Sequence, residues 1–250
     1  MSLTVYADFS CPDCYLAAHR VDVLRAAGIA VDWRAVELSP HLPVGGRRLS
    51  PAEQDALAQR FAELDEMLLP GEVLPRAIPA LLPKTEAAVS AYAEAYGIGV
   101  ADDVRRLLTA LYWEQGADIG SPAVLRAPLE GPILRGNSAV EALHTSGYAV
   151  SVDRGPITFE AWRRTVTWHR EWAELGSPAL PVVLIGGATL SGRDALQRLG
   201  KEIDYAVAPI APEWDDPRRF PSAGTATPSA RWVSWYGGRW RHGFRLRPAR

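Results

Sequence analysis

The only two cysteines of this 250-residue chain stand three positions apart, where a strand pattern gives way to a helix pattern. The run from Leu3 to Ala7 is apolar and rich in strand-forming residues, and residues 15–27 carry apolar side chains at helical spacing. Two thiols one helical turn apart can close a disulfide with little backbone movement. Cys11 and Cys14 therefore predict a redox pair at a strand-to-helix junction.

The four residues of this Cys-Pro-Asp-Cys motif have different expected roles. The first turn of a helix has unpaired N–H groups and a partial positive charge, which favour a thiolate. Cys11 is therefore the expected nucleophile, and Cys14 the resolving thiol that attacks a mixed disulfide. Pro12 suits the first helical position, where its missing N–H costs nothing. Asp13 tunes the pair, because its negative charge opposes the Cys11 thiolate and predicts a less oxidising couple than a basic dipeptide would give.

Two other uses of the cysteines stay open. A structural zinc site needs about four ligands, and the chain has no second Cys-x-x-Cys and no ligand spacing among its five histidines. The pair could also be an inert structural disulfide or two idle thiols. Redox chemistry is the favoured interpretation, and we expect no metal and no tightly bound cofactor.

The composition is that of an ordinary globular protein, with 48% hydrophobic residues, 22% charged residues and a formal net charge of -2. This charge predicts no general attraction to nucleic acid or to a membrane surface. No basic segment with a following apolar stretch opens the sequence, and no apolar run approaches the roughly 18–20 residues of a membrane span. We therefore expect a cytoplasmic protein. In the cytoplasm structural disulfides are rare, and a single Cys-x-x-Cys tends to alternate between its disulfide and dithiol forms.

Strand and helix patterns indicate a domain that is split in two. Residues 1–40 predict a strand, a helix and a second strand, a unit that is right-handed with parallel strands. Residues 178–208 predict two short strands joined at Gly186-Gly187 and then a final helix. Together the two halves predict a thioredoxin-like α/β sheet.

Residues 50–176 predict an all-helical insertion between these halves. Ser50 and Glu53 form a capping box with Pro51 at the first helical position, and Ser138 with Glu141 predicts another helix start. Helices are expected from Ser50 onward and at about 84–96, 102–115, 138–146 and 158–175. The last of these carries a stripe that we interpret as core rather than as the lining of a substrate cleft: Trp162, Val166, His169 and Trp172.

Three runs of residues resemble the cytoplasmic branch of the DsbA-like thioredoxin superfamily. They are Asp8-Phe9-Ser10-Cys11-Pro12-Asp13-Cys14-Tyr15, Leu111-Tyr112-Trp113-Glu114-Gln115-Gly116-Ala117-Asp118-Ile119 and Leu180-Pro181-Val182-Val183-Leu184-Ile185-Gly186-Gly187, and the resemblance covers about residues 3–207. It implies a thiol-disulfide oxidoreductase that acts on protein or small-molecule thiols and disulfides. In this family the proline that opens the third strand is cis and faces the active-site disulfide. Pro181 would occupy that place, and the backbone of Leu180 would help hold a substrate disulfide alongside Cys11.

The same superfamily branch includes 2-hydroxychromene-2-carboxylate isomerases and kappa-class glutathione transferases, which share the helical insertion. A serine generally replaces the first cysteine in those enzymes, whereas this chain has both Cys11 and Cys14. The resemblance therefore favours disulfide exchange. A transferase or isomerase that depends on glutathione or another low-molecular-weight thiol is the alternative.

The extension over residues 209–250 has a different character. From Pro217 onward it carries eight arginines and no acidic residue, interleaved with aromatic residues. Such a tail can bind single-stranded nucleic acid by stacking, so a non-catalytic binding module stays open. The paired glycines at 237–238 favour a β-hairpin over residues 231–246 that packs on the body or on a second subunit. Nucleic acid is therefore the disfavoured partner, and a homodimer is left open.

Overall fold

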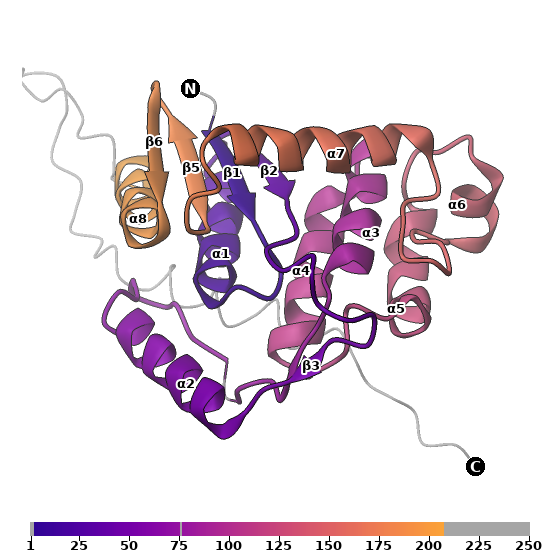
Figure 1. Cartoon of the computed structure of the whole chain (residues 1–250). Coiled ribbons are helices and arrows are strands. Elements are labelled where there is room, and N and C mark those ends of the chain that lie inside the picture. The colour runs from indigo at the N-terminus through magenta and orange to yellow at the C-terminus, as the bar shows by residue number, and fades with distance from the viewer. Residues whose placement is uncertain (1–2, 76, 208–250) are drawn as a thin grey trace, which may run out of the picture. The chain divides into compact units, whose positions relative to one another are not determined.

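The computed structural model describes residues 3–75 and 77–207, which belong to the first of the two units into which the chain divides, residues 1–207. The predicted extension over 209–250 and its hairpin over 231–246 lie outside the described residues. Within these, no helix is long and apolar enough to cross a lipid bilayer. The elements of the first unit follow one another as β1 (Leu3–Ala7), α1 (Pro12–Ala26), β2 (Val31–Ala35), β3 (Arg47–Arg48), α2 (Pro51–Asp65), β4 (Leu81–Leu82), α3 (Glu86–Gly97), α4 (Ala101–Trp113), α5 (Pro122–Leu134), α6 (Glu141–Ser146), α7 (Phe159–Glu174), β5 (Val182–Ile185), β6 (Ala188–Ser191) and α8 (Gly192–Val207) (Figure 1).

The two halves predicted from the sequence meet in one mixed sheet of four strands, in the order β2-β1-β5-β6. β1 runs parallel to β2, with Leu3 opposite Val31, and antiparallel to β5, with Leu3 opposite Ile185. The turn between β5 and β6 consists of Gly186 and Gly187, both at positive φ (56° and 82°), which glycine adopts without steric cost. The predicted strands and their glycine turn are thus confirmed.

Helices cover both faces of this sheet. Val5 and Trp33 lie opposite each other on one face and are buried, because successive side chains of a strand point to opposite faces. α1 and α8 pack side by side as one layer, and α7 extends from β1 and β2 along α3 at the top of Figure 1. On the opposite face, the Tyr6 hydroxyl of β1 donates to the Glu171 carboxylate of α7 at 3.1 Å. The sheet therefore lies between two helical layers, as in an α/β fold.

The segment between β2 and β5 is dominated by helices, but it contains one that the sequence patterns did not predict. α5 includes Pro128 and Pro132 in its interior, and proline removes a helical hydrogen bond, so this stretch does not show a helical signature. Its buried residues Leu125, Leu129 and Ile133 recur every four positions, and their burial supports the helix. A two-stranded sheet of β3 and β4, also not predicted, joins the loop before α2 to the segment before α3.

The two predicted helix starts had different outcomes. Ser50 forms the expected capping box: its hydroxyl accepts from the Glu53 N–H at 3.3 Å, and the Glu53 carboxylate accepts from the Ser50 N–H at 2.8 Å. The predicted start at Ser138 is wrong, because α6 begins at Glu141 with Val140 as its N-cap. The Ser138 hydroxyl instead accepts from the Val140 N–H at 3.1 Å, a local turn that competes with helix capping.

The predicted aromatic core stripe of α7 is only partly correct. Trp172 is buried, but Trp162 and Val166 are 50% and 45% exposed, and His169 is exposed as well. The helix instead buries Trp168, whose ring packs against Tyr92 and Tyr96 of α3. Packing against α3 therefore decides which face of α7 is covered.

Candidate active site

Cys11 is the N-cap residue of α1, directly after the loop that follows β1. Its backbone is extended (φ -83°, ψ 124°), and its carbonyl oxygen accepts from the Tyr15 N–H at 3.1 Å. Pro12 occupies the first helical turn, and Cys14 lies one turn into the helix. Both thiols are free, so the structure has the dithiol form of the pair.

The two thiols differ in their electrostatic environment. Both thiols are buried, with Cys11 6% and Cys14 2% exposed. Burial raises the pKa of the Cys14 thiol well above the ordinary value, and a hydrogen bond to Cys11 and the charge of Cys11 raise this pKa further. Cys14 therefore stays protonated at neutral pH. Cys11 lies where the unpaired N–H groups of the α1 N-terminus favour an anion.

The start of β5 lies against Cys11. The Cys11 thiol donates a hydrogen bond to the carbonyl oxygen of Leu180 at 3.7 Å, and the Leu180–Pro181 peptide bond is cis. β1 and β5 are paired antiparallel neighbours, so the start of β5 lies beside the end of β1, close to where α1 begins. The structure thus brings Cys11, Cys14, Leu180 and Pro181 together.

Asp8 anchors the loop that carries Cys11, and the sequence patterns gave it no role. Its carboxylate is fully buried and accepts from the N–H and the hydroxyl of Ser10, both at 2.6 Å. It also accepts from the Leu38 N–H at 2.8 Å and from the Thr85 hydroxyl at 2.6 Å. One side chain therefore ties the end of β1 to the segments that follow β2 and precede α3.

Trp113, at the end of α4, supports the same loop from another side. Its indole Nε1–H donates to the Phe9 carbonyl oxygen at 2.9 Å. Its ring makes edge-to-face contacts with Phe61 of α2 and Tyr15 of α1, with ring centroids 5.5 and 6.1 Å away. Trp113 belongs to one of the runs that carried the family resemblance, but only the structure gives it this contact.

Asp13 forms an ion pair that sequence reasoning missed. The Arg60 Nε–H of α2 donates to one carboxylate oxygen of Asp13 at 2.9 Å, and an Nη–H of Arg60 donates to the other. The Asp13 side chain is only 10% exposed. The sequence shows Arg60 on a predicted helix, but its pairing across 47 positions has no local signal.

No cluster of three or more His, Cys, Asp or Glu side chains is placed to hold a metal ion in the part of the chain that the structure describes. Within that part, the Cys11–Cys14 pair has no neighbouring ligands that would complete a zinc site. The arrangement can support the chemistry of the two thiols themselves.

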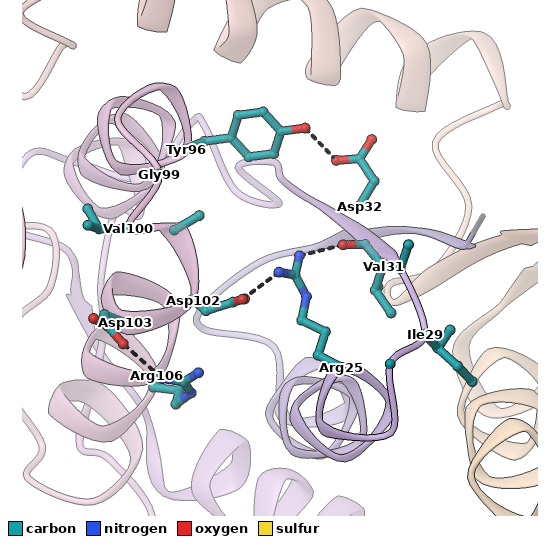
Figure 2. A pocket seen from close by; sticks show the side chains of 13 residues that line it. Arg25, Ile29, Val31, Asp32, Tyr96, Gly99, Val100, Asp102, Asp103 and Arg106 are labelled. Carbon is teal, nitrogen blue, oxygen red and sulfur yellow. Dashed lines mark hydrogen bonds and ion pairs between the residues drawn. The ribbon is translucent and has the colours of Figure 1, made fainter. Parts of the chain in front are cut away.

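A separate pocket of about 840 Å³ lies at the other end of α1. Figure 2 shows that its charged side chains are hydrogen-bonded within the pocket: Arg25 donates to Asp102 and to the Val31 carbonyl oxygen, Arg106 donates to Asp103, and the Tyr96 hydroxyl donates to Asp32. The 15 residues of α1 span about 22 Å at the usual rise per residue. The pocket is therefore remote from Cys11, and we do not assign the chemistry to it.

Comparison with known proteins places this geometry in a family. The sequence profile of the DsbA-like thioredoxin domain matches residues 2–154, more than half of the chain, while no curated protein matches. Among solved structures, a probable DsbA oxidoreductase from Streptomyces coelicolor has a TM-score of 0.61 at 16% identity, with 92% of this chain and 97% of that chain covered. The cytosolic disulfide reductase DsbM from Pseudomonas aeruginosa has a TM-score of 0.54 at 15% identity (82% and 95% covered), and a 2-hydroxychromene-2-carboxylate isomerase has 0.55 at 18% (82% and 95%). At these identities the structural likeness shows the shared thioredoxin fold, and the profile match shows that the chain belongs to the DsbA-like thioredoxin family.

Proposed function

We propose that the protein is a thiol-disulfide oxidoreductase that exchanges the Cys11–Cys14 disulfide with protein or small-molecule thiols. One observation carries this proposal: Cys11 begins α1 beside the Leu180 backbone, while Cys14 lies buried one turn further with a raised pKa. An exchange enzyme needs this difference, because one thiol must react first and the other must wait.

The reaction balances with the two thiols alone. The Cys11 thiolate attacks a substrate disulfide, forms a mixed disulfide with one substrate sulfur and releases the other as a thiolate. Cys14 then attacks the Cys11 sulfur, and the second substrate sulfur leaves and takes up the Cys14 proton. The dithiol is oxidised by two electrons, and the substrate disulfide is reduced to two thiols. Two molecules of a low-molecular-weight thiol would reduce the enzyme disulfide again and leave as their own disulfide, and the reverse sequence oxidises substrates.

The backbone around Leu180 and Pro181 supports a docking role. Pro181 has no N–H, and the Leu180 carbonyl oxygen already lies next to the Cys11 thiol, so an incoming chain would meet an acceptor there. The DsbM fold neighbour has also been solved with glutathione, and its name describes a cytosolic enzyme. These facts support glutathione as the first thiol to test and the cytoplasm as the place of action.

The redox equilibrium of the pair tests the proposal. Wild-type protein is equilibrated with glutathione buffers of graded potential, quenched with acid, alkylated and weighed by mass spectrometry. We expect a two-electron couple within the span of thioredoxin-fold enzymes, roughly -270 to -120 mV. Cys14→Ser should accumulate a glutathione adduct on Cys11, whereas Cys11→Ser should not.

The same experiment separates the alternative. If glutathione binds but neither a Cys11–Cys14 disulfide nor a mixed disulfide forms across the series, the exchange proposal is overturned. A thiol-dependent isomerase or transferase would then account for the fold shared with 2-hydroxychromene-2-carboxylate isomerase. Conjugation and isomerisation assays would follow.

A further inference from the structure

The carboxylate inside the Cys-Pro-Asp-Cys motif is bound by a cation from outside it. Both carboxylate oxygens of Asp13 accept hydrogen bonds from the guanidinium of Arg60, with Nε–H to oxygen at 2.9 Å. The Asp13 side chain is 10% exposed and that of Arg60 is 28% exposed, so solvent screens this pair only in part. A two-point contact of this kind is a geometry that arginine offers and lysine does not.

The position of Arg60 is set by the docking of α2. The next residue, Phe61, is buried and packs edge-to-face on Trp113, and Leu64, one turn further, is fully buried. Arg60 also donates to Glu63, whose side chain is 44% exposed and thus well screened by water. The hydrogen bonds to Asp13 are the leading cause that raises the pKa of Arg60, so its positive charge persists at any physiological pH.

We propose that Arg60 is a positioning residue for disulfide exchange: it neutralises Asp13, which lies two positions after Cys11 in the first turn of α1, and thereby sets the redox equilibrium of the Cys11–Cys14 pair. This inference rests on the function proposed above and adds a residue that lies outside the motif. The dipeptide between the cysteines, read alone, predicts a repelled thiolate. With Arg60 in place, the dipeptide and its partner together carry no net charge.

The sign of each substitution follows from the charges. Arg60→Gln leaves the Asp13 carboxylate without its partner, which destabilises the Cys11 thiolate and makes the couple more reducing. Asp13→Asn leaves the Arg60 cation facing the motif, which stabilises the thiolate and makes the couple more oxidising. Replacing both residues removes both charges and should return the pair close to the wild-type state.

A double-mutant cycle tests this relationship. The pKa of Cys11 is measured from the pH dependence of alkylation in a Cys14→Ser background, and the redox equilibrium with glutathione in the two-cysteine protein. We expect Arg60→Gln to raise the Cys11 pKa, and Asp13→Asn to lower it, by about half a unit to one unit. The equilibrium constants should move in opposite directions by about three- to tenfold, or about 15–30 mV. The Asp13→Asn/Arg60→Gln double variant should lie within the error of wild type.

Two further variants control for charge and for folding. Arg47→Gln removes the same charge from an exposed ion pair with Glu53 at the start of α2 and should leave Cys11 unchanged. Arg60→Lys keeps the charge but loses the two-point contact. It should therefore change the Cys11 pKa and the redox equilibrium in the same direction as Arg60→Gln, but by less. Thermal unfolding of each variant shows whether the fold is retained.

The outcomes separate this inference from the function on which it rests. If wild-type protein exchanges disulfides and Arg60→Gln leaves both the Cys11 pKa and the potential unchanged in a folded protein, Arg60 has only a structural role and the inference is overturned. It is also overturned if both single variants shift in the same direction. If wild-type protein shows no exchange at all, the proposed function itself fails.

Discussion

The thiol of Cys11 donates a hydrogen bond to the carbonyl oxygen of Leu180 at 3.7 Å, although 169 positions separate the two residues in the sequence. The antiparallel pairing of β1 with β5 makes this contact possible, because it places the start of β5 beside the end of β1, where α1 starts. The reactive thiol therefore lies between the loop that follows β1 and the residues that precede β5, and the two central strands hold both segments in place.

We expect a limiting amount of an alkylating agent to modify Cys11 before Cys14 in the reduced protein at neutral pH. Only the thiolate reacts, and burial raises the pKa of Cys14 well above the ordinary value. A difference of one pKa unit changes the thiolate fraction about tenfold, so the rates should differ by about tenfold or more. Peptide mass spectrometry over time measures both rates, and equal labelling would contradict the assigned roles.

Trp113→Phe should lower the free energy of unfolding by about 1–3 kcal/mol, because it leaves the buried Phe9 carbonyl oxygen without its indole donor. Urea unfolding measures the change. Trp162→Phe is the matched control, since the Trp162 side chain is half exposed on α7 and its replacement should change the stability by no more than about 0.5 kcal/mol. Equal effects of the two substitutions would show that the Trp113 hydrogen bond does not anchor the loop.

Asp8→Asn should destabilise the fold by about 2–4 kcal/mol, because charge-assisted hydrogen bonds to a buried carboxylate are lost and an amide hydrogen then faces donors. The affected donors are the groups of Ser10, Leu38 and Thr85. Asp55→Asn, on the exposed side of α2, is the control and should be near neutral. Chemical denaturation distinguishes the two; similar midpoints would contradict an anchoring role for Asp8.

Acid should weaken the fold through His19. Burial lowers its pKa in the folded state, and this outweighs the charge of Asp22, which acts in the opposite direction. The unfolded chain, with a histidine pKa of about 6.5, then binds the proton more tightly. The stability that neutral His19 contributes is complete above that pH and is lost as the pH falls through the folded-state pKa.

The measurement is the free energy of unfolding at a series of pH values from 7.5 to 5 (about the range in which histidine titrates). His19→Phe, which keeps a ring against Tyr15, should flatten the slope in this range. His41→Phe, at an exposed position, should leave the slope as in wild type. A wild-type slope that persists in His19→Phe would assign the acid sensitivity to other groups.

The local features of the fold were predictable because a few neighbouring residues encode them. The capping box of Ser50 and Glu53 spans four positions, and the two-glycine turn between β5 and β6 needs only its own residues. α5 was not predicted because Pro128 and Pro132 disfavour a helix in their own neighbourhood. The burial of its apolar face stabilises the helix in spite of them, and the local sequence does not show that burial. On α7, periodicity indicated an apolar stripe, but contact with α3 decided that Trp168 is covered and Trp162 exposed.

Local sequence patterns were enough to place two thiols at a strand-to-helix junction, with Pro12 in the first turn and Cys14 one turn further. A family resemblance was needed to single out Pro181. The folded chain was needed to show that Leu180 contacts Cys11 and that Arg60 pairs with Asp13, across 169 and 47 positions. Helix caps and turns follow from the conformational preferences of adjacent residues, whereas these contacts depend on how the sheet closes and where α2 docks, which no local pattern encodes.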